Sequence, residues 1–228
     1  PVDSYKTRIG IRSVEFTTSG GFKINGEAIR FRGANRCQDY PYIGFAMGNL
    51  EQRQDAKLLK EAGFEYIRAE HEPMDPAFMD ACDELGIMVL ACIPGSLHFG
   101  GEIFAQRSYQ TSRDLIRRDR NHPCVIAWEL SINETWWNDP NFSQTTVNIG
   151  HAEYPGSYIG GYKDSGAWGT PAIYDIAITG GPGFSVETYN GTLPVIQHEY
   201  GHWEYGGLGS TSDVHRGDGQ AAMLEQAV

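Results

Sequence analysis

The sequence alternates four times between a short apolar run and an amphipathic run, and this alternation restricts the fold more than any other feature. The run at 87–93 contains only apolar residues, which is typical of a strand buried on both faces of a parallel sheet. Gly63 and Gly86 stand where two of the amphipathic runs should end as helices. Repeated strand–helix units predict an α/β fold with a parallel sheet. The predicted strands are 29–35, 66–70, 87–93 and 124–130, and the predicted helices are 50–62, 76–85 and 103–120.

The second half of the chain is less regular but continues the pattern. It predicts three further strands, at 158–162, 174–178 and 194–200, and helices at 145–153 and 220–228. Seven such strands suit a (β/α)₈ TIM-type barrel, which needs an eighth strand to close. We therefore expect an α/β barrel whose C-terminal part, including the eighth strand, is missing from this chain. Either the chain is a fragment or another segment completes the barrel.

The N-terminal residues show a different pattern. Residues 5–16 contain β-branched and aromatic side chains that predict an extended segment. Residues 20–31 predict a β-hairpin, since Asn25 and Gly26 both tolerate the positive φ of a tight turn. This hairpin leads into the first predicted barrel strand.

The composition excludes several kinds of partner. The formal net charge is −11, from 18 Lys and Arg against 29 Asp and Glu, so the chain repels nucleic acids and anionic membrane surfaces. No apolar run approaches the roughly 20 residues that a membrane-spanning helix needs. None of the four cysteines stands at a metal-ligand spacing from another, so we expect neither a zinc site nor a disulfide framework.

Two glutamates follow apolar strands at the point where a barrel carries its chemistry. Glu134 follows the strand at 124–130, and Glu199 lies near the end of the strand at 194–200. Active sites of parallel barrels lie at the C-terminal ends of the strands. A retaining glycosidase needs two carboxyl groups about 5 Å apart, and Asn133 beside Glu134 is suited to hold a sugar hydroxyl. The alternative is that both glutamates merely cap helices or pair with arginines.

Several motifs resemble glycoside hydrolase family 2 and occur in the family's order. The segment RDRNHPCVIAWELSINE, at 118–134, is similar to the family's acid/base signature, and LPVIQHEYGH, at 193–202, to its nucleophile strand. The resemblance implies that Glu134 is the general acid/base and that Glu199 is the nucleophile. It also implies that residues 1–19 are the end of a preceding β-sandwich domain or a linker, and that 20–228 are the truncated catalytic barrel.

The same resemblance suggests which residues bind the sugar. The run from Glu199 to His202 resembles β-galactosidases, in which a histidine at this place helps to bind the sugar. Arg68 and His71 match an Arg-x-x-His pair of the family, and Asn35 begins an Asn-Arg-Cys run where the family often has Asn-Arg-His. Trp203 follows a strand end and is placed either to stack on a sugar or to pack in the core. The expected substrate-binding residues are therefore Asn133, His71, His202, Arg68, Asn35 and Trp203.

These observations together favour a retaining exo-β-glycosidase, with galactose as the preferred sugar. A β-glucuronidase or β-mannosidase on the same machinery, or a catalytically inactive carbohydrate-binding homologue, is the alternative. We expect no cofactor and no metal, because Pro94 and Gly95 stand where the best-known β-galactosidases carry a magnesium-binding glutamate. The expected partners are a glycoside or oligosaccharide and the remaining domains of a longer enzyme, and a homo-oligomer is compatible with the sequence. The compartment stays open, with a periplasmic or secreted location preferred to the cytoplasm.

Overall fold

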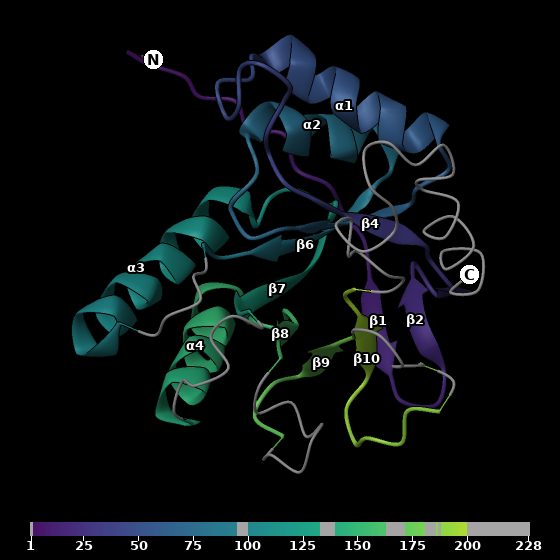
Figure 1. Cartoon of the computed structure of the whole chain (residues 1–228), viewed down its shortest axis with the longest axis vertical. Helices are drawn as coiled ribbons and strands as arrows, with labels where there is room; N and C mark the ends of the chain where they lie inside the picture. Colours follow the sequence, from purple (N-terminus) through teal and green to yellow (C-terminus); the bar gives the residue numbers. More distant parts are fainter. Residues whose placement is uncertain are drawn as a thin grey trace, which may run out of the picture.

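The computed structural model describes residues 2–94, 100–132, 140–162, 172–180, 186 and 188–199. Seven of its strands form one parallel sheet in the order β10-β9-β8-β7-β6-β5-β4, so that neighbours in the sheet are also neighbours in sequence. The sheet curls into an incomplete barrel (Figure 1). The strands are β4 Gly33–Arg36, β5 Tyr66–Ala69, β6 Met88–Cys92, β7 Val125–Ser131, β8 Ile159–Gly161, β9 Ile176–Thr179 and β10 Val195–Gln197. The predicted parallel α/β barrel is confirmed.

In the part of the chain that the structure describes, four helices lie on the outer side of the sheet, where α1 contacts α2 and α3 contacts α4 (Figure 1). Asp75 caps the N-terminus of α2 by accepting a hydrogen bond from the Ala77 amide at 2.7 Å. Gly86 ends the same helix in the left-handed conformation, with φ of 68°. Among the described residues, no helix combines the length and hydrophobicity needed to cross a bilayer. The helices are α1 Asn49–Glu61, α2 Pro76–Leu85, α3 Gly101–Asp119 and α4 Pro140–Glu153.

Two boundaries differ from the sequence-based prediction. Helix α4 begins at Pro140, five residues before the predicted start. Proline suits the first turn of a helix, because an N–H at that position would have no acceptor within the helix. The strand predicted at 29–35 is divided into β3 Glu27–Ile29 and β4. The division arises because β3 pairs with the hairpin whereas β4 pairs with β5. The helix predicted at 220–228 lies outside the described residues.

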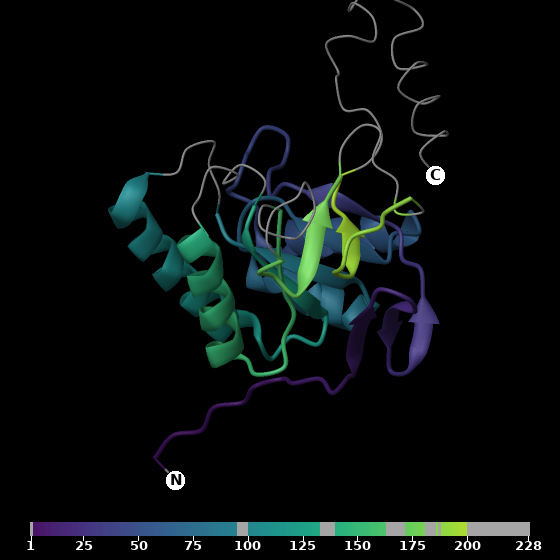
Figure 2. The same ribbon diagram turned by 90° about the horizontal axis from the view of Figure 1, so that it is seen from below.

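A three-stranded antiparallel sheet covers the N-terminal end of the barrel (Figure 2). The predicted hairpin turn is confirmed, with φ of 52° at Asn25 and 83° at Gly26. The rings of Phe16 and Phe22 pack with their centroids 4.8 Å apart, and the rings of Phe22 and Phe31 pack with their centroids 5.0 Å apart. These aromatic rings close the end of the barrel opposite to the expected active site. The strands are β1 Val14–Thr17, β2 Gly21–Ile24 and β3.

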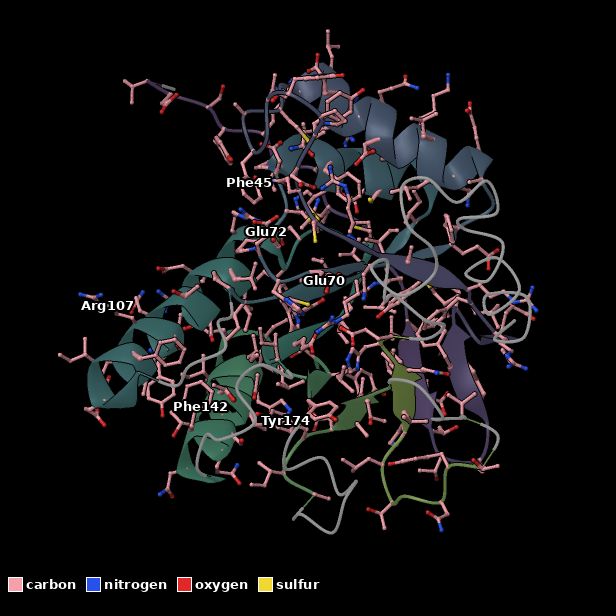
Figure 3. The ribbon with its side chains drawn as sticks, viewed as in Figure 1. Phe45, Glu70, Glu72, Arg107, Phe142 and Tyr174 are labelled. Carbon is pink, nitrogen blue, oxygen red and sulfur yellow. The ribbon has the colours of Figure 1, made fainter. Side chains whose placement is uncertain are left out.

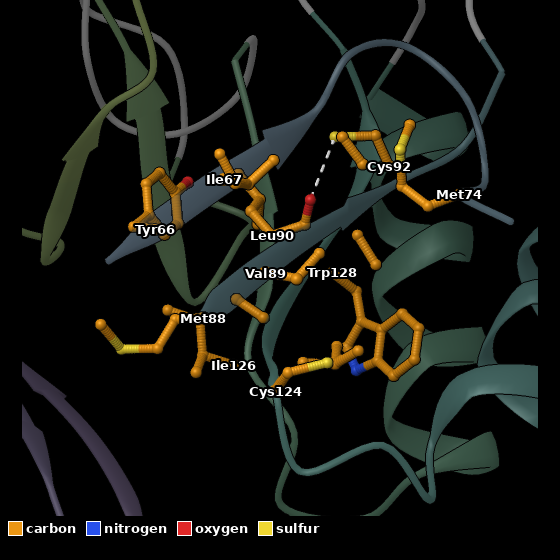
Figure 4. Packing of buried hydrophobic residues seen from close by; sticks show 14 of the residues in the cluster. Tyr66, Ile67, Met74, Met88, Val89, Leu90, Cys92, Cys124, Ile126 and Trp128 are labelled. Carbon is orange, nitrogen blue, oxygen red and sulfur yellow. Dashed lines mark hydrogen bonds between the residues drawn. The ribbon is translucent and has the colours of Figure 1, made fainter. Parts of the chain in front are cut away.

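The barrel core is made of apolar side chains from the central strands (Figure 4). Every residue of β6 is buried, as its uninterrupted apolar sequence predicts. Trp128 on β7 is the largest fully buried side chain, with 1% of its surface exposed. Cys82, Cys92 and Cys124 are buried in the same core as small apolar residues. The buried core of the barrel thus lies beneath the C-terminal strand ends.

Candidate active site

The C-terminal ends of several strands place polar side chains around one mouth of the barrel. Asn35 on β4 pairs in register with Arg68 on β5, and Glu129 lies on β7. Glu199 lies two residues beyond β10. Parallel strands bring these ends to the same side of the sheet, which is the side where barrels bind substrates. Glu70, directly after β5, lies near the centre of the molecule, whereas Arg107 on α3 lies at its outer side (Figure 3).

Glu199 contacts one arginine and one histidine. Its Oε1 is 3.5 Å from Nη1 of Arg68, and its Oε2 is 3.4 Å from Nε2 of His198. Burial raises the pKa of this carboxyl group, but His198, Arg68 and His71 outweigh burial and leave the pKa below its ordinary value. The side chain keeps 18% of its surface exposed. Glu199 is therefore an accessible carboxylate anion at neutral pH, the state that a nucleophile requires.

Arg68 is completely buried and is held by a second carboxylate. Its Nε donates to Oε2 of Glu129 at 2.6 Å, and its Nη2 donates to Oε1 of the same residue at 2.9 Å. Both side chains have no exposed surface. Burial alone would lower the pKa of Arg68, but the charge of Glu129 raises it, so the guanidinium stays protonated. This paired geometry is the strongest type of carboxylate–arginine contact.

His71 completes this group of residues in its neutral form. Burial, followed by the charge of Arg68, lowers the pKa of His71 to about 4. A neutral imidazole has one donor and one acceptor nitrogen and is suited to bind a sugar hydroxyl. Single ligand atoms of Glu70, His71 and Glu199 all lie within 4.8 Å of one another, so this group also has the side chains that bind a divalent metal. The expected absence of a metal stays a prediction.

The structure brings together four of the eight predicted site residues. Asn35, Arg68, His71 and Glu199 lie at the same mouth. Asn35 and Glu199 also line a cavity of about 1290 Å³, which follows the open side of the sheet between β4 and β10 down to the N-terminal hairpin. The Oδ1 atom of Asn35 is buried and has no hydrogen-bond partner among the described residues. The other four predictions lie outside the described residues, namely Glu134, Asn133, His202 and Trp203.

Sequence reasoning missed Glu129 and His198. Glu129 interrupts an otherwise apolar strand, and a charged residue at such a place indicates a buried partner. That signal was available, but it does not identify the partner, which lies 61 residues away in sequence. His198 precedes Glu199 on the same strand end and has only 5% of its surface exposed.

A second cluster of titratable groups lies at the opposite end of β7. Nδ1 of His122 is 2.7 Å from Oδ2 of Asp83, and Oδ1 of Asp83 accepts a hydrogen bond from the Cys124 amide at 2.9 Å. The hydrogen bond to Asp83 raises the pKa of His122. These contacts join α2 to the start of β7, as expected for a structural histidine on the stability side of a barrel.

Comparisons with known proteins identify the family to which the chain belongs. Residues 14–149 match the family described as "Glycosyl hydrolases family 2, TIM barrel domain". The chain belongs to glycoside hydrolase family 2. A β-galactosidase from Thermoanaerobacter pseudethanolicus is 43% identical over 151 residues, which are 66% of this chain and 20% of that protein. A relative from Formosa agariphila named as a β-glucuronidase is 35% identical over 139 residues, which are 60% of this chain and 16% of that protein.

Solved structures of two β-glucuronidases superpose on this chain. The FMN-binding β-glucuronidase from Faecalibacterium prausnitzii superposes with a TM-score of 0.69 at 29% identity, over 76% of this chain and 28% of that one. A β-D-glucuronidase from Dictyoglomus thermophilum superposes with a TM-score of 0.80 over 97% of this chain and 45% of that one, but at 20% identity it supports the fold alone. The chain spans about a fifth of the length of the curated relatives that it matches.

Proposed function

We propose that the protein containing this chain is a retaining exo-β-glycosidase in which Glu199 is the nucleophile. The observation that carries the proposal is the Glu199 carboxylate, accessible at the barrel mouth and kept anionic by Arg68 and His198. Family membership supports the hydrolase class, because the related proteins are named as glycosidases.

The proposed reaction has two displacement steps. Glu199 attacks the anomeric carbon, the glycosidic C–O bond breaks, and the leaving oxygen takes a proton from Glu134. Glu134 then removes a proton from water, which attacks the anomeric carbon and releases Glu199 from its ester. The role of Glu134 is supported by its sequence motif. It is also supported by its position shortly after β7, because the C-terminal end of β7 lies at the same mouth of the barrel as Glu199. Asn35 and His71 would bind hydroxyl groups of the sugar, together with Asn133, His202 and Trp203.

We propose a neutral sugar, and galactose in particular, as the group that is released. Cys37, directly after β4, is an exposed thiol whose pKa is raised by partial burial and by the charges of Glu70, Asp39 and Glu72, against the opposing charge of Arg36. Such surroundings disfavour the carboxylate of a glucuronide. Arg68 is already committed to Glu129 and Glu199. The relatives named as β-galactosidases support this choice, and those named as β-glucuronidases keep glucuronate as the second candidate.

A panel of nitrophenyl β-glycosides tests both the class and the sugar. The full-length protein should hydrolyse the galactoside fastest, while a Glu199→Gln variant should be inactive on the whole panel. Faster hydrolysis of glucuronides or mannosides would refute galactose and keep the family mechanism. Binding of sugars without any turnover would identify an inactive carbohydrate-binding homologue instead.

A further inference from the structure

The site contains a carboxylate, Glu129, that is completely buried beneath the barrel mouth. Glu129 has no exposed surface and is linked to Glu199 through Arg68, while the charge of His198 acts on both carboxylates. Isolated charges are costly to bury, so a fully buried glutamate and arginine require each other. Glu199 is a third charge on the same guanidinium, and Arg68 is therefore shared between two carboxylates.

The sharing is unequal. Arg68 donates two hydrogen bonds to the Glu129 carboxylate, from Nε at 2.6 Å and from Nη2 at 2.9 Å. Its contact with Glu199 is a single, longer one, from Nη1 at 3.5 Å. Most of the guanidinium charge is thus offset by Glu129 before it acts on the nucleophile. A carboxylate facing an unshared arginine would be held more firmly as an anion and would be a weaker nucleophile.

Formation of the glycosyl-enzyme makes the pairing of Arg68 with Glu129 more important. When Glu199 forms its C–O bond to the anomeric carbon, its carboxylate changes from an anion to a neutral ester. Arg68 would then be a buried cation without a counter-ion if Glu199 were its only partner, which is strongly unfavourable. Glu129 remains ionised throughout and keeps Arg68 paired in both states.

Neighbouring strands hold Glu129 in place. Cys92 on β6 is its Cα partner in register, and the Cys92 thiol donates a hydrogen bond to Oε2 of Glu129 at 2.9 Å. Burial and the charge of Glu129 raise the pKa of Cys92 well above its usual range, so the thiol keeps its proton and acts as a donor. Burial raises the pKa of Glu129, but Arg68 outweighs burial and keeps the carboxylate ionised.

We propose that Glu129 is a positioning residue that offsets the charge of Arg68, so that Glu199 can pass from carboxylate to glycosyl ester without leaving a buried unpaired cation. This proposal rests on the proposed role of Glu199 as the nucleophile. In this proposal, the role of Glu129 explains why a charged residue lies within the buried strand β7. The hydrogen bond from the Cys92 thiol helps to orient its carboxylate.

The test is the pH profile of kcat/KM for Glu129→Gln and Glu129→Asp in the full-length protein, on the nitrophenyl glycoside that the wild type hydrolyses fastest. Loss of the Glu129 charge makes the surroundings of Glu199 more positive and so lowers its pKa. The acidic limb of Glu129→Gln should therefore move to lower pH by roughly one unit, with roughly a tenfold loss in kcat. Glu129→Asp keeps the negative charge but moves it away from Arg68 by the length of one methylene group. Its acidic limb should therefore shift to lower pH by less than that of Glu129→Gln, and a shift in either variant supports the proposal.

A matched control separates this effect from general damage to the fold. Asp119 is another buried carboxylate held by two hydrogen bonds from one arginine, Arg118, at 2.6 and 2.8 Å. It lies at the C-terminus of α3, away from the strand ends that carry the site. Asp119→Asn should lower stability and leave the acidic limb in place.

The outcomes also separate this proposal from the proposed function. Wild-type turnover with covalent labelling of Glu199 by a 2-deoxy-2-fluoro-glycosyl fluoride supports the nucleophile role. If that labelling occurs and the Glu129 variants lose activity with an unmoved acidic limb, the role of Glu129 is only structural and the inference is wrong. A wild-type protein that is inactive, or labelled elsewhere, overturns the proposed function and this inference with it.

Discussion

At the scale of single residues, substitution of the two proposed catalytic glutamates should impair different steps of the reaction. Glu134→Ala should still form the glycosyl-enzyme from a nitrophenyl glycoside, because nitrophenolate leaves without protonation, but it should lose roughly 10²–10⁴-fold in hydrolysis. Azide needs no general base, so it should restore turnover and give the β-glycosyl azide. Glu199→Ala removes the covalent path, and azide there should give the α-glycosyl azide. Determining the anomeric configuration of each product by NMR checks the assignment, and exchanged products would mean exchanged roles.

His71 provides a test by pH. Its pKa is about 4 in the folded protein and near 6.5 when unfolded, so the unfolded chain binds more protons between these values. The folded state therefore loses stability as the pH falls through this window, by on the order of 3 kcal/mol. His71→Gln should show a smaller drop in melting temperature between pH 7.5 and 4.5 than the wild type. Equal drops in the two proteins would show that His71 titrates normally.

The site was predictable where its chemistry is local in sequence. A polar residue after an apolar strand predicts Glu199 as a site residue, and in the structure it lies just beyond the C-terminal end of β10. Arg68 was expected to bind substrate, yet it is completely buried against Glu129. That pairing depends on the register of β5 against β6 and of β6 against β7, which strand patterns alone do not specify. Its direct contact with a sugar stays a prediction.

At the scale of secondary-structure elements, Gly33 sets how closely β4 approaches β5. A Cβ atom on Gly33 would overlap the backbone carbonyl of Tyr66, which cannot move without shifting β5. Gly33→Ala should therefore cost about 1–3 kcal/mol of stability. Gly48 before α1 is the matched control, because its added Cβ meets only the flexible end of Glu51 at 2.7 Å. Thermal unfolding of both variants checks this, and equal melting temperatures would contradict it.

The elements themselves were predictable from local patterns, and α2 matches its predicted range completely. An N-cap aspartate, a proline in the first turn and a glycine at the end specify this helix from sequence alone. The break between β3 and β4 was not predictable in this way. The chain leaves one sheet and enters another there, because β3 pairs with β2 whereas β4 pairs with β5. Tertiary pairing, rather than propensity, decides such boundaries.

At the scale of the whole molecule, the domain boundary expected at residues 19 and 20 stays a proposal. Strand β1 lies before that boundary and pairs with β2 beyond it, so the two sides share a sheet. The aromatic contacts of Phe16 tie this sheet to the barrel through Tyr158, at 4.9 Å between ring centroids. We propose that residues 20–228 form the barrel proper and that the preceding segment leads from another domain of the full-length protein.

The last prediction concerns closure of the barrel. Strands β4 and β10 are the two edges of the sheet, and an eighth strand in the full-length protein should pair with both. His198 donates its amide hydrogen to Thr179 on β9, and Glu70 donates to Arg36 on β4, so by strand alternation the amides of Val195 and Asn35 point towards the open edges.

Hydrogen exchange measured by NMR should therefore separate the 228-residue chain from the full-length protein. The amides of Val195 and Asn35 should exchange at least about tenfold more slowly in the full-length protein, because an exchanging amide must first break a strand pair. The amides of β6, which has neighbours on both sides in either protein, are the internal control and should exchange alike. If the edge amides also exchange alike while β6 is protected in both, the eighth strand does not join these edges, and the barrel closes by another route.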